Sequence, residues 1–176
     1  MKKINLSLVN RPIKITPKKY LDKRGYFQEV YLNKKFGLNI NFTAIAKSKK
    51  NVIRGLHFQL KNKQTKLIHV IDGTILDIVI NLRKKSRYFG KVYKFILREG
   101  DMLFVPNFYS HGYECISNKC TILYHLEKYR DKKNELGIKF DDVKIKNKWK
   151  TKKPILSKRD KLLMSFKEFQ KNFKTL

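Results

Sequence analysis

Hydrophobic and polar residues alternate in short runs through most of this chain, and the alternation predicts β-strands. Between Thr74 and Leu82, one set of alternate positions is entirely apolar and the other includes Asp77 and Asn81, the pattern of a strand with one face in a core. The dipeptide Asp72-Gly73 before this run predicts a hairpin. The expected strands cover residues 26–32, 41–46, 52–58, 65–71, 74–82, 92–97, 102–105, 112–116 and 121–126. Many short strands with turns between them predict a mostly β fold, either a sandwich or a jelly-roll barrel.

The chain changes character after Pro154, where a helix is expected. Ser157 and Asp160 have the spacing of a capping box, and an apolar stripe follows at helical spacing. The stripe consists of Leu162, Leu163, Phe166, Phe169 and Phe173. We expect a C-terminal helix over residues 158–173, packed on the outside of the barrel, and an irregular Lys-rich segment over residues 131–149. Since there is no internal repeat and no flexible linker, residues 1–176 are predicted to form one domain.

The net charge of +28 at pH 7 raises nucleic acid as a partner, but the kind of basic residue argues against it. Only eight of the 42 basic residues are Arg, and the others are lysines spread from Lys2 to Lys174. Proteins that read a nucleic-acid sequence depend on Arg for bidentate contacts to phosphates and guanine edges. We therefore expect no nucleic-acid partner, and a solvated surface that attracts small anions such as nucleotides.

Cysteine usage and the N-terminal residues predict a cytoplasmic protein. Cys115 and Cys120 could face each other across a hairpin, but the simplest interpretation is two reduced thiols. The basic N-terminal start is interrupted by Asn5, Ser7 and Asn10, so no signal peptide is expected. No run approaches the roughly 18–20 apolar residues of a membrane span, so we expect no membrane partner.

The segment Arg-Gly-Leu-His-Phe-Gln carries the first candidate for catalysis, His57. A lone histidine in a strand is more often structural, but Gly55 permits close backbone approach and Arg54 can clamp a phosphate. Other reactive side chains lie on or beside the expected strands that follow: Lys66, His111 and Tyr124. A base, a cation, a second imidazole and a phenol form the set that proton abstraction beside a carbonyl needs. This combination predicts an enzyme that moves protons.

Each of these residues also has an ordinary explanation, and spacing alone singles none of them out. Lys66 would be an exposed lysine in a lysine-rich chain, and Tyr124 would be one aromatic residue of the barrel. Asp160 would be only the acidic member of a capping box. His111, however, follows Pro106 at the spacing of the second signature of cupin barrels, where the histidine faces the barrel interior.

A metal site is not favoured by this set of residues. In metal cupins the first signature supplies His-x-His and a glutamate, whereas the corresponding element here is His57-Phe58-Gln59 with no glutamate a few residues on. Two histidines without a paired carboxylate are a poor ligand set for a catalytic divalent metal. A metal-dependent cupin enzyme that uses His57, Gln59 and His111 is the first rival interpretation.

The chain also carries an ordered series of short motifs. They occupy residues 22–29, 52–59, 64–68, 77–83, 86–90, 105–112, 123–124 and 156–160. In this order they resemble the dTDP-4-dehydrorhamnose 3,5-epimerase family, from about Pro12 to Asp160. The resemblance implies a cupin-like jelly-roll subunit of a homodimer that acts on a nucleotide-linked 4-keto-6-deoxyhexose. It also implies that the enzyme works without a metal or an organic cofactor.

The resemblance further implies a role for each candidate residue. His57 would be the base that removes the proton beside the 4-keto group, with Asp160 orienting it, and Lys66 would hold the developing enolate oxygen. Tyr124 would return a proton on the opposite face of the sugar ring, which inverts the centre. The residues that would support the oxyanion site are His111 and its neighbour Asp77. The residues implied to bind the substrate are Arg24, Phe27, Glu29, Arg54, Gln59 and Tyr129.

The strand before Arg54 departs from the family pattern. Where Gln-x-Asn-x-Ser-x-Ser is usual, Phe42 and Ala44 stand at the amide positions, and Asn81 replaces the usual aspartate before Leu-Arg. The proton-transfer residues are therefore present while part of the ligand shell is replaced. This leaves open a different nucleotide, a different 4-keto sugar, or inversion at only one carbon. A second rival is a barrel that binds sugar nucleotides or polyanions without turnover, and an RNA-binding protein is the weakest candidate.

Overall fold

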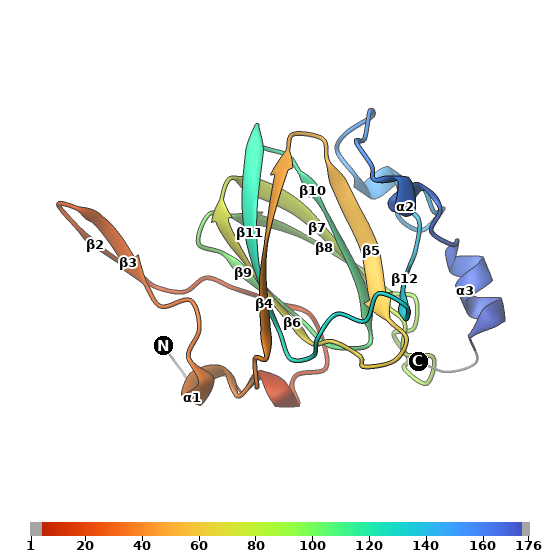
Figure 1. The fold of residues 1–176 in the computed structure, drawn as a ribbon, viewed down its shortest axis with the longest axis horizontal. Coiled ribbons are helices and arrows are strands. Elements are labelled where there is room, and N and C mark those ends of the chain that lie inside the picture. Colours follow the sequence, from red (N-terminus) through yellow and green to blue (C-terminus); the bar gives the residue numbers. More distant parts are fainter. Residues whose placement is uncertain (1–4, 174–176) are drawn as a thin grey trace.

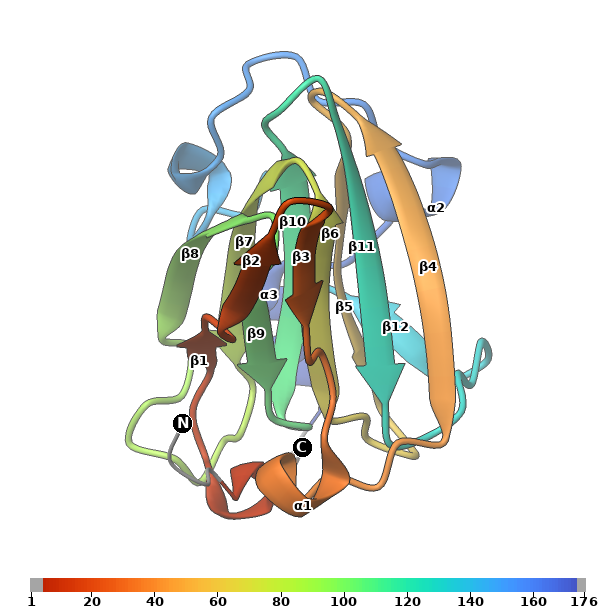
Figure 2. The ribbon, with the colours of Figure 1, turned by 90° about the vertical axis from the view of Figure 1, so that its left-hand side faces the viewer.

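Two antiparallel five-stranded sheets face each other in the computed structural model, which describes residues 5–173 (Figures 1 and 2). The first sheet has the order β1 (Ile13–Ile15), β9 (Met102–Val105), β6 (Lys66–Asp72), β11 (Lys119–Leu126) and β4 (Phe42–Lys49). The second has the order β12 (Glu135–Gly137), β5 (Ile53–Gln59), β10 (Tyr109–Cys115), β7 (Thr74–Asn81) and β8 (Val92–Arg98). The mostly β fold with two facing sheets is the one the alternating pattern predicted.

A separate hairpin and several short helices complete the structure. The hairpin, β2 (Lys19–Asp22) and β3 (Gly25–Gln28), projects away from the barrel (Figure 1). The helical segments are η1 (Leu6–Leu8), α1 (Asn33–Phe36), η2 (Lys146–Lys148), α2 (Lys158–Lys161) and α3 (Phe166–Asn172). None of the helices in the described part of the chain is long and apolar enough to cross a membrane. The basic N-terminal start at residues 1–4 and the C-terminal residues 174–176, with Lys174, lie outside the described residues.

Strand β7 is buried on both faces, so the expectation of a single buried face was wrong. On one face, Ile75 and Val79 belong to the core between the sheets. On the other face, Ile78 and Ile80 pack in a cluster with Phe166 and other apolar side chains of the C-terminal segment. The alternation correctly indicated which side chains share a face with Asp77 and Asn81. The opposite face is buried as well, because apolar side chains of the C-terminal segment, far away in the sequence, pack on it.

The turn at Asp72-Gly73 connects a strand of one sheet to a strand of the other, so the predicted hairpin was wrong. Strand β6 pairs with β9 and β11, whereas β7 pairs with β8 and β10. Gly73 has a positive φ of 83°, and a Cβ there would lie 2.2 Å from the carbonyl oxygen of Lys119. The glycine is therefore needed for the turn itself, but both a hairpin and a passage between sheets can use it.

The two cysteines also lie in different sheets, because the chain passes from β10 to β11 between them. Cys115 and Cys120 therefore do not face each other across a hairpin. Both thiols are free and buried in the core between the sheets.

The strand bounds differ from the expected ones mainly at the ends. Residues 102–105 match β9, whereas the strand expected at 26–32 already ends at Gln28. Three strands were missed: β1, β2 and β12. They have only three or four residues each, too few for an alternating pattern, and β12 lies in the segment expected to be irregular. Its strand character comes from pairing with β5, where Gly137 lies opposite His57.

The expected C-terminal helix is interrupted, and only its two ends are helical as α2 and α3. The Ser157 hydroxyl caps α2 by accepting from the Asp160 backbone N–H at 3.0 Å, but the Asp160 carboxylate turns toward β5 instead of completing the box. A complete capping box opens α3 at Ser165 and Glu168. Between the helices, Met164 forms a bridge to Ile138, the residue that follows β12. The position of α3 outside the barrel is as predicted (Figure 1).

Replacing Phe169 with alanine should lower the free energy of unfolding by about 3–5 kcal/mol, because the ring is fully buried among other aromatic rings. Urea denaturation would measure the loss. Leu162→Ala is the matched control, since Leu162 is 85% exposed in the same segment and should change stability by less than about 0.5 kcal/mol. Equal losses in the two variants would contradict the packing of α3 on the barrel.

Candidate active site

One pocket of about 540 Å³ opens between the two sheets and collects the residues expected to carry the chemistry. Its lining comes mainly from β4, β5, β6, β10 and β11 and from residues 155–160, with Glu135 of β12 and Arg130 beside it. The expected proton-transfer residues in its lining are His57, Lys66, His111, Tyr124 and Asp160. Residues that are up to 103 positions apart in the sequence are thus brought to one cavity.

The position of His57 depends on a close approach between β5 and β10. His57 lies directly opposite His111 in the pairing of these strands, next to a register shift in β10. A Cβ at Gly55, where φ is +105°, would lie 2.6 Å from the carbonyl oxygen of His111. A Cβ at Gly112 would lie 2.7 Å from the carbonyl oxygen of Arg54. Only residues without a side chain permit this spacing, so the two glycines bring the two imidazoles into one pocket.

The His57 ring is held by a buried carboxylate. Its Nε2 lies 2.7 Å from Oδ1 of Asp160, and the other carboxylate oxygen accepts from the Gly55 backbone N–H at 3.5 Å. Burial alone would raise the pKa of Asp160, but the hydrogen bond and charge of His57 outweigh it and the net pKa is lowered. The ionised carboxylate therefore accepts from Nε2–H, which leaves the lone pair on Nδ1 to take a proton. The side chain is 25% exposed, so it is accessible from the pocket.

A second imidazole–carboxylate pair lies deeper in the barrel. Nε2 of His111 is 2.8 Å from Oδ2 of Asp77, and both side chains are buried. Burial lowers the pKa of His111 and raises the pKa of Asp77, and the interaction between the two opposes both shifts without cancelling them. The pair is therefore biased toward its uncharged forms, in which it can still donate and accept hydrogen bonds.

Lys66 is a buried lysine, not the exposed one of the ordinary interpretation. Its Nζ lies 3.5 Å from the carbonyl oxygen of His57. Burial lowers the pKa of Lys66 to about 8, and the negative charges of Glu135 and Asp77 oppose this shift. An ammonium in such a site interacts strongly with a nearby oxyanion because little water screens it.

Tyr124 lies on β11, in the sheet opposite the one that carries His57. Its ring meets that of His111 edge to face, with centroids 6.3 Å apart. Burial raises the pKa of Tyr124 well above 10, so the phenol keeps its proton at neutral pH. The pocket therefore has an imidazole with a free lone pair on one sheet and a phenol that can donate on the other.

Three residues near the pocket were missed by the sequence analysis. Glu135 on β12 accepts from Nε of Arg130 at 2.6 Å and from the guanidinium of Arg159. Burial would raise the pKa of Glu135, but the hydrogen bond from Arg130 and the nearby positive charges bring it to about 2. The carboxylate also accepts from Nε2 of Gln59 at 3.3 Å. Arg159 lies in the motif at residues 156–160, but no sequence signal marks Glu135 or Arg130, because the three residues meet only when the short strand β12 pairs with β5.

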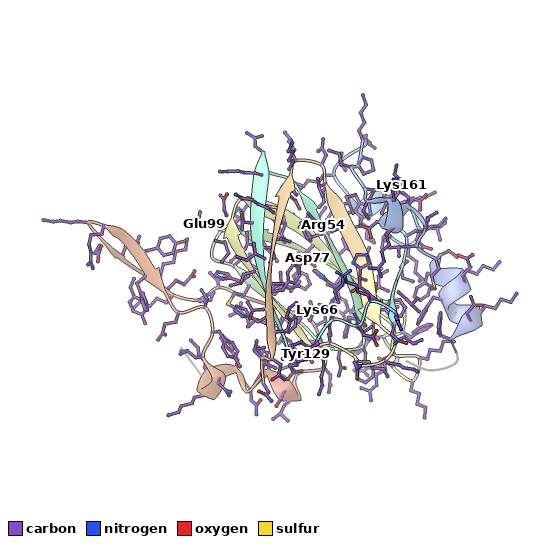
Figure 3. All side chains as sticks on the ribbon, in the orientation of Figure 1. Arg54, Lys66, Asp77, Glu99, Tyr129 and Lys161 are labelled. Atoms are coloured by element: carbon purple, nitrogen blue, oxygen red, sulfur yellow. The ribbon has the colours of Figure 1, made fainter. Side chains whose placement is uncertain are left out.

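The residues expected to bind substrate fall into two groups. Arg54 lines the pocket, with its guanidinium donating to the Ser48 hydroxyl at 3.0 Å. Gln59 is buried beside the pocket, bonded to Glu135, and does not line it. Tyr129 is 70% exposed and packs against Phe42, which does line the pocket (Figure 3).

The other three lie on or next to the projecting hairpin and do not line this pocket: Arg24, Phe27 and Glu29. Arg24 forms an ion pair with Asp22 at 2.6 Å, and Phe27 is 68% exposed. Within one chain, the structure does not bring them to His57.

The residues of the metal-cupin interpretation do not converge on one point. In the described part of the chain, no group of three or more His, Cys, Asp or Glu side chains could hold a metal ion. His57 and His111 each direct Nε2 to a carboxylate, and Gln59 points to Glu135. These contacts are those of hydrogen-bonded acid–base groups.

Comparison with known proteins agrees with this geometry. The family model described as dTDP-4-dehydrorhamnose 3,5-epimerase matches residues 8–168. A dTDP-4-dehydrorhamnose 3,5-epimerase of Methanothermobacter thermautotrophicus is 38% identical over 148 residues, which is 77% of each chain. The crystal structure of such an epimerase from Sulfolobus tokodaii superimposes with a TM-score of 0.84 at 33% identity, covering 92% of this chain and 93% of that one.

A third relative was solved with a ligand. The dTDP-6-deoxy-D-glucose-3,5-epimerase of Legionella pneumophila, in complex with dTDP-4-keto-L-rhamnose, has a TM-score of 0.82 at 26% identity. The match covers 92% of this chain and 90% of that one. The similarity thus extends over nearly the whole of both chains.

Lys66 should titrate far below the other lysines, with a midpoint near pH 8, because burial disfavours its ammonium form. NMR of the protein with labelled lysine side chains would follow this, against about 10.4 for exposed lysines. The resonance should be missing from Lys66→Gln, which assigns it. If every lysine titrated above pH 10, Lys66 would not be buried as described.

Proposed function

Because the chain belongs to the dTDP-4-dehydrorhamnose 3,5-epimerase family, we propose that it inverts C3, C5 or both carbons of a nucleotide-linked 4-keto-6-deoxyhexose. The protein is an epimerase, and thus an isomerase. To this enzyme class we add a proposed class of substrate and a proposed path for the protons through the side chains of the pocket. The observation that carries it is the placement of His57 and Tyr124 on opposite sheets of one pocket, which Lys66 also lines from the sheet of Tyr124.

In the first step, His57 Nδ1 takes the proton from the carbon beside the 4-keto group. The electron pair of the broken C–H bond moves into the ketone, which becomes an enolate. The Asp160 carboxylate, 2.7 Å from Nε2, stabilises the imidazolium that forms. Because the carboxylate is ionised before the reaction, the stabilisation requires no further proton movement.

The enolate oxygen needs a positive group, and Lys66 lines the pocket with its Nζ 3.5 Å from the carbonyl oxygen of His57. Its ammonium form carries the positive charge, so the rate should fall as the pH rises through about 8. His111 supports the same region through a ring that is hydrogen-bonded to Asp77 and whose pKa is lowered by burial.

In the second step, the Tyr124 phenol gives its proton to the carbon from the other face. The enolate returns to the ketone, and the configuration at that carbon is inverted. The phenolate regains a proton from solvent and the imidazolium releases one, so that protons balance over a cycle. The high pKa of Tyr124 suits this role, because the donor must be protonated when the enolate forms.

The nucleotide end of the substrate requires positive charge at the pocket mouth. Arg54, Arg130 and Arg159 line the cavity, and the last two also hold Glu135. The β4 wall is apolar at Phe42 and Ala44, so the arginines carry the polar contacts to the diphosphate in this proposal.

A second copy of the chain would supply the projecting hairpin. Tyr26 donates to Glu99 at 2.7 Å, which connects the hairpin to the turn after β8, while Phe27 stays exposed at 68%. Because β2 and β3 point away from the barrel of their own chain, Arg24 and Phe27 can serve a site only in a neighbouring subunit (Figure 1). We therefore include a homodimer that shares residues between subunits in the proposal.

The proposed reaction is tested by solvent exchange. The enzyme is incubated in heavy water with dTDP-4-keto-6-deoxyglucose, and NMR follows deuterium at C3 and C5. His57→Ala should slow exchange by about 100- to 10,000-fold, because no base remains. Tyr124→Phe should retain exchange but lose inversion, since the phenol acts second. The control is Tyr88→Phe, an exposed tyrosine outside the pocket, which should behave as the parent.

If no exchange occurs at either carbon with this or related 4-keto sugar nucleotides, the substrate class is wrong. If Tyr124→Phe epimerises at the parental rate, the tyrosine is not the acid. Exchange at a single carbon would restrict the proposal to one inversion.

Sharing of the hairpin predicts complementation between two inactive variants. His57→Ala lacks the base and Arg24→Ala lacks the hairpin cation, so each homodimer should be weak. After the two are unfolded and refolded together, about half of the dimers carry one intact site, which gives about a quarter of the parental activity. A mixture no more active than its separate components would rule out a site shared between subunits.

A further inference from the structure

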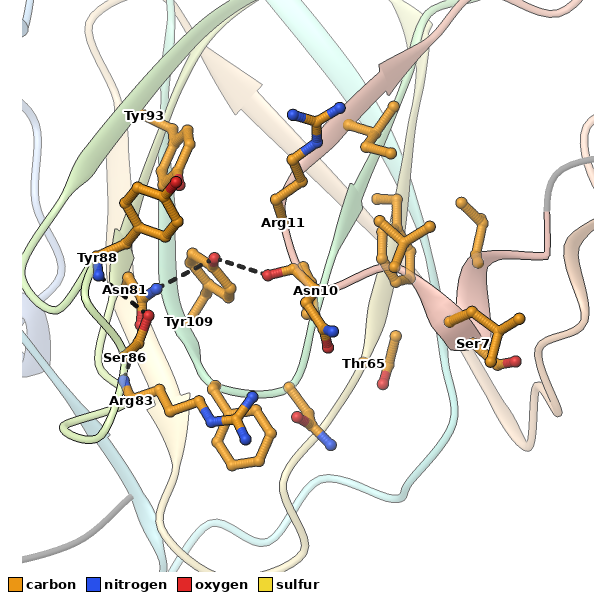
Figure 4. A pocket seen from close by; sticks show the side chains of 18 of the residues that line it. Ser7, Asn10, Arg11, Thr65, Asn81, Arg83, Ser86, Tyr88, Tyr93 and Tyr109 are labelled. Atoms are coloured by element: carbon orange, nitrogen blue, oxygen red, sulfur yellow. Dashed lines mark hydrogen bonds between the residues drawn. The ribbon is translucent and has the colours of Figure 1, made fainter.

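A second cavity lies at the end of the barrel where β7 ends and β10 begins (Figure 4). Its volume is about 730 Å³, and it shares no lining residue with the candidate active site. Lining comes from residues 6–11 of the N-terminal segment, the loop after β7 and the turn before β10. The two cavities are close along the chain, because Thr65 lines this one and Lys66 the other.

Three cations line this second cavity: Arg11, Arg83 and Lys91. Arg11 comes from the N-terminal segment, whereas Arg83 and Lys91 come from the loop between β7 and β8, and all three side chains are exposed. In the described part of the chain, none of them forms an ion pair. Glu127 is the one acidic residue among the lining residues, so positive charge dominates. A concave site lined by one sign of charge concentrates ions of the opposite sign.

The walls around these cations are fixed by aromatic residues and hydrogen bonds. The Tyr109 hydroxyl donates to the Asn10 carbonyl at 3.0 Å and accepts from the Asn81 side chain at 3.3 Å (Figure 4). The ring of Tyr93 packs on that of Tyr109 with centroids 6.0 Å apart. Lys91 is held over the Tyr93 ring at 5.2 Å. The cavity thus has a preformed wall, unlike a set of loose surface lysines.

We propose that this cavity is a second ligand site, which binds a small anion with a pyrophosphate group. Arginine recognises phosphate through paired N–H donors, and the site offers two arginines and a lysine without carboxylate partners. The volume is within the range of small-molecule sites, so a nucleoside diphosphate fits as well as free pyrophosphate. The proposal goes beyond the epimerase function and does not depend on it.

The net charge of +28 requires a control for diffuse attraction of anions. The pocket variant is Arg11→Gln, Arg83→Gln and Lys91→Gln together. The matched control combines Lys85→Gln, Lys94→Gln and Arg98→Gln. It removes the same charge from exposed positions in the loop after β7 and on β8 that line neither cavity. Thermal unfolding of each variant checks the fold, and single Arg83→Gln replaces the triple variant should that one unfold.

Titration calorimetry of the full chain at moderate salt measures the number of binding sites and their affinity for inorganic pyrophosphate and for dTDP. The parent should show a site whose affinity for pyrophosphate falls at least about tenfold in the pocket variant and is unchanged in the control. Arg54→Gln should leave this site intact, which separates it from the active site. A preference for dTDP over pyrophosphate at this site would identify a nucleotide as the ligand.

Two results would overturn the proposal. Equal weakening in the pocket variant and the control would show diffuse attraction. Binding that is lost only in Arg54→Gln would show that the active site is the one site for pyrophosphate. Because no turnover is measured, a failed epimerase assay would not affect either conclusion.

Discussion

The close approach between β5 and β10 is the constraint on which the candidate active site depends. At Gly55 and Gly112, an added Cβ would lie 2.6–2.7 Å from backbone oxygens of the neighbouring strand. Without side chains at these positions, His57 and His111 lie opposite each other, and each ring reaches a carboxylate on a further element, one on α2 and the other on β7. One requirement of the backbone therefore positions two imidazole–carboxylate pairs, and both open toward a phenol and an ammonium from the other sheet.

Much of the fold followed from alternation, and its failures share a physical cause. The class of the fold could be predicted, because a half-buried strand alternates whatever its partner is. The bounds of β9 were also predicted, although its four residues are all apolar and buried and do not alternate. Asp72-Gly73 was interpreted as a hairpin because a glycine with positive φ serves that turn, yet the same glycine serves a passage between sheets. The choice between the two depends on which strands pair, and pairing is decided by contacts distant in sequence. The short β12 was missed for the same reason.

The candidate site was predictable where residues lie within a recognisable motif and not where they meet through tertiary pairing. His57 and Lys66 were selected with their motifs, although burial of Lys66 could not be known from a lysine-rich sequence. Glu135 was missed because its importance arises when β12 pairs with β5 and two arginines meet it. Arg24 lies in a matching motif, yet its own chain holds it away from the pocket. Motifs thus indicated the chemistry, while the structure decided which groups share one cavity.

Asp160 shows how the site overrides the local preference of the chain. Its position after Ser157 favours a complete capping box, in which the carboxylate would bond back to the Ser157 backbone. Instead the carboxylate is buried against His57 and the Gly55 backbone, and α2 ends after one turn. Burying a carboxylate costs free energy unless it is paired, and here the pairing lowers its pKa in spite of burial. Two features of the chain therefore accompany the interruption of the helix: the Asp160 carboxylate holds the imidazole, and Ser165, in an extended conformation, starts a new helix with its capping box.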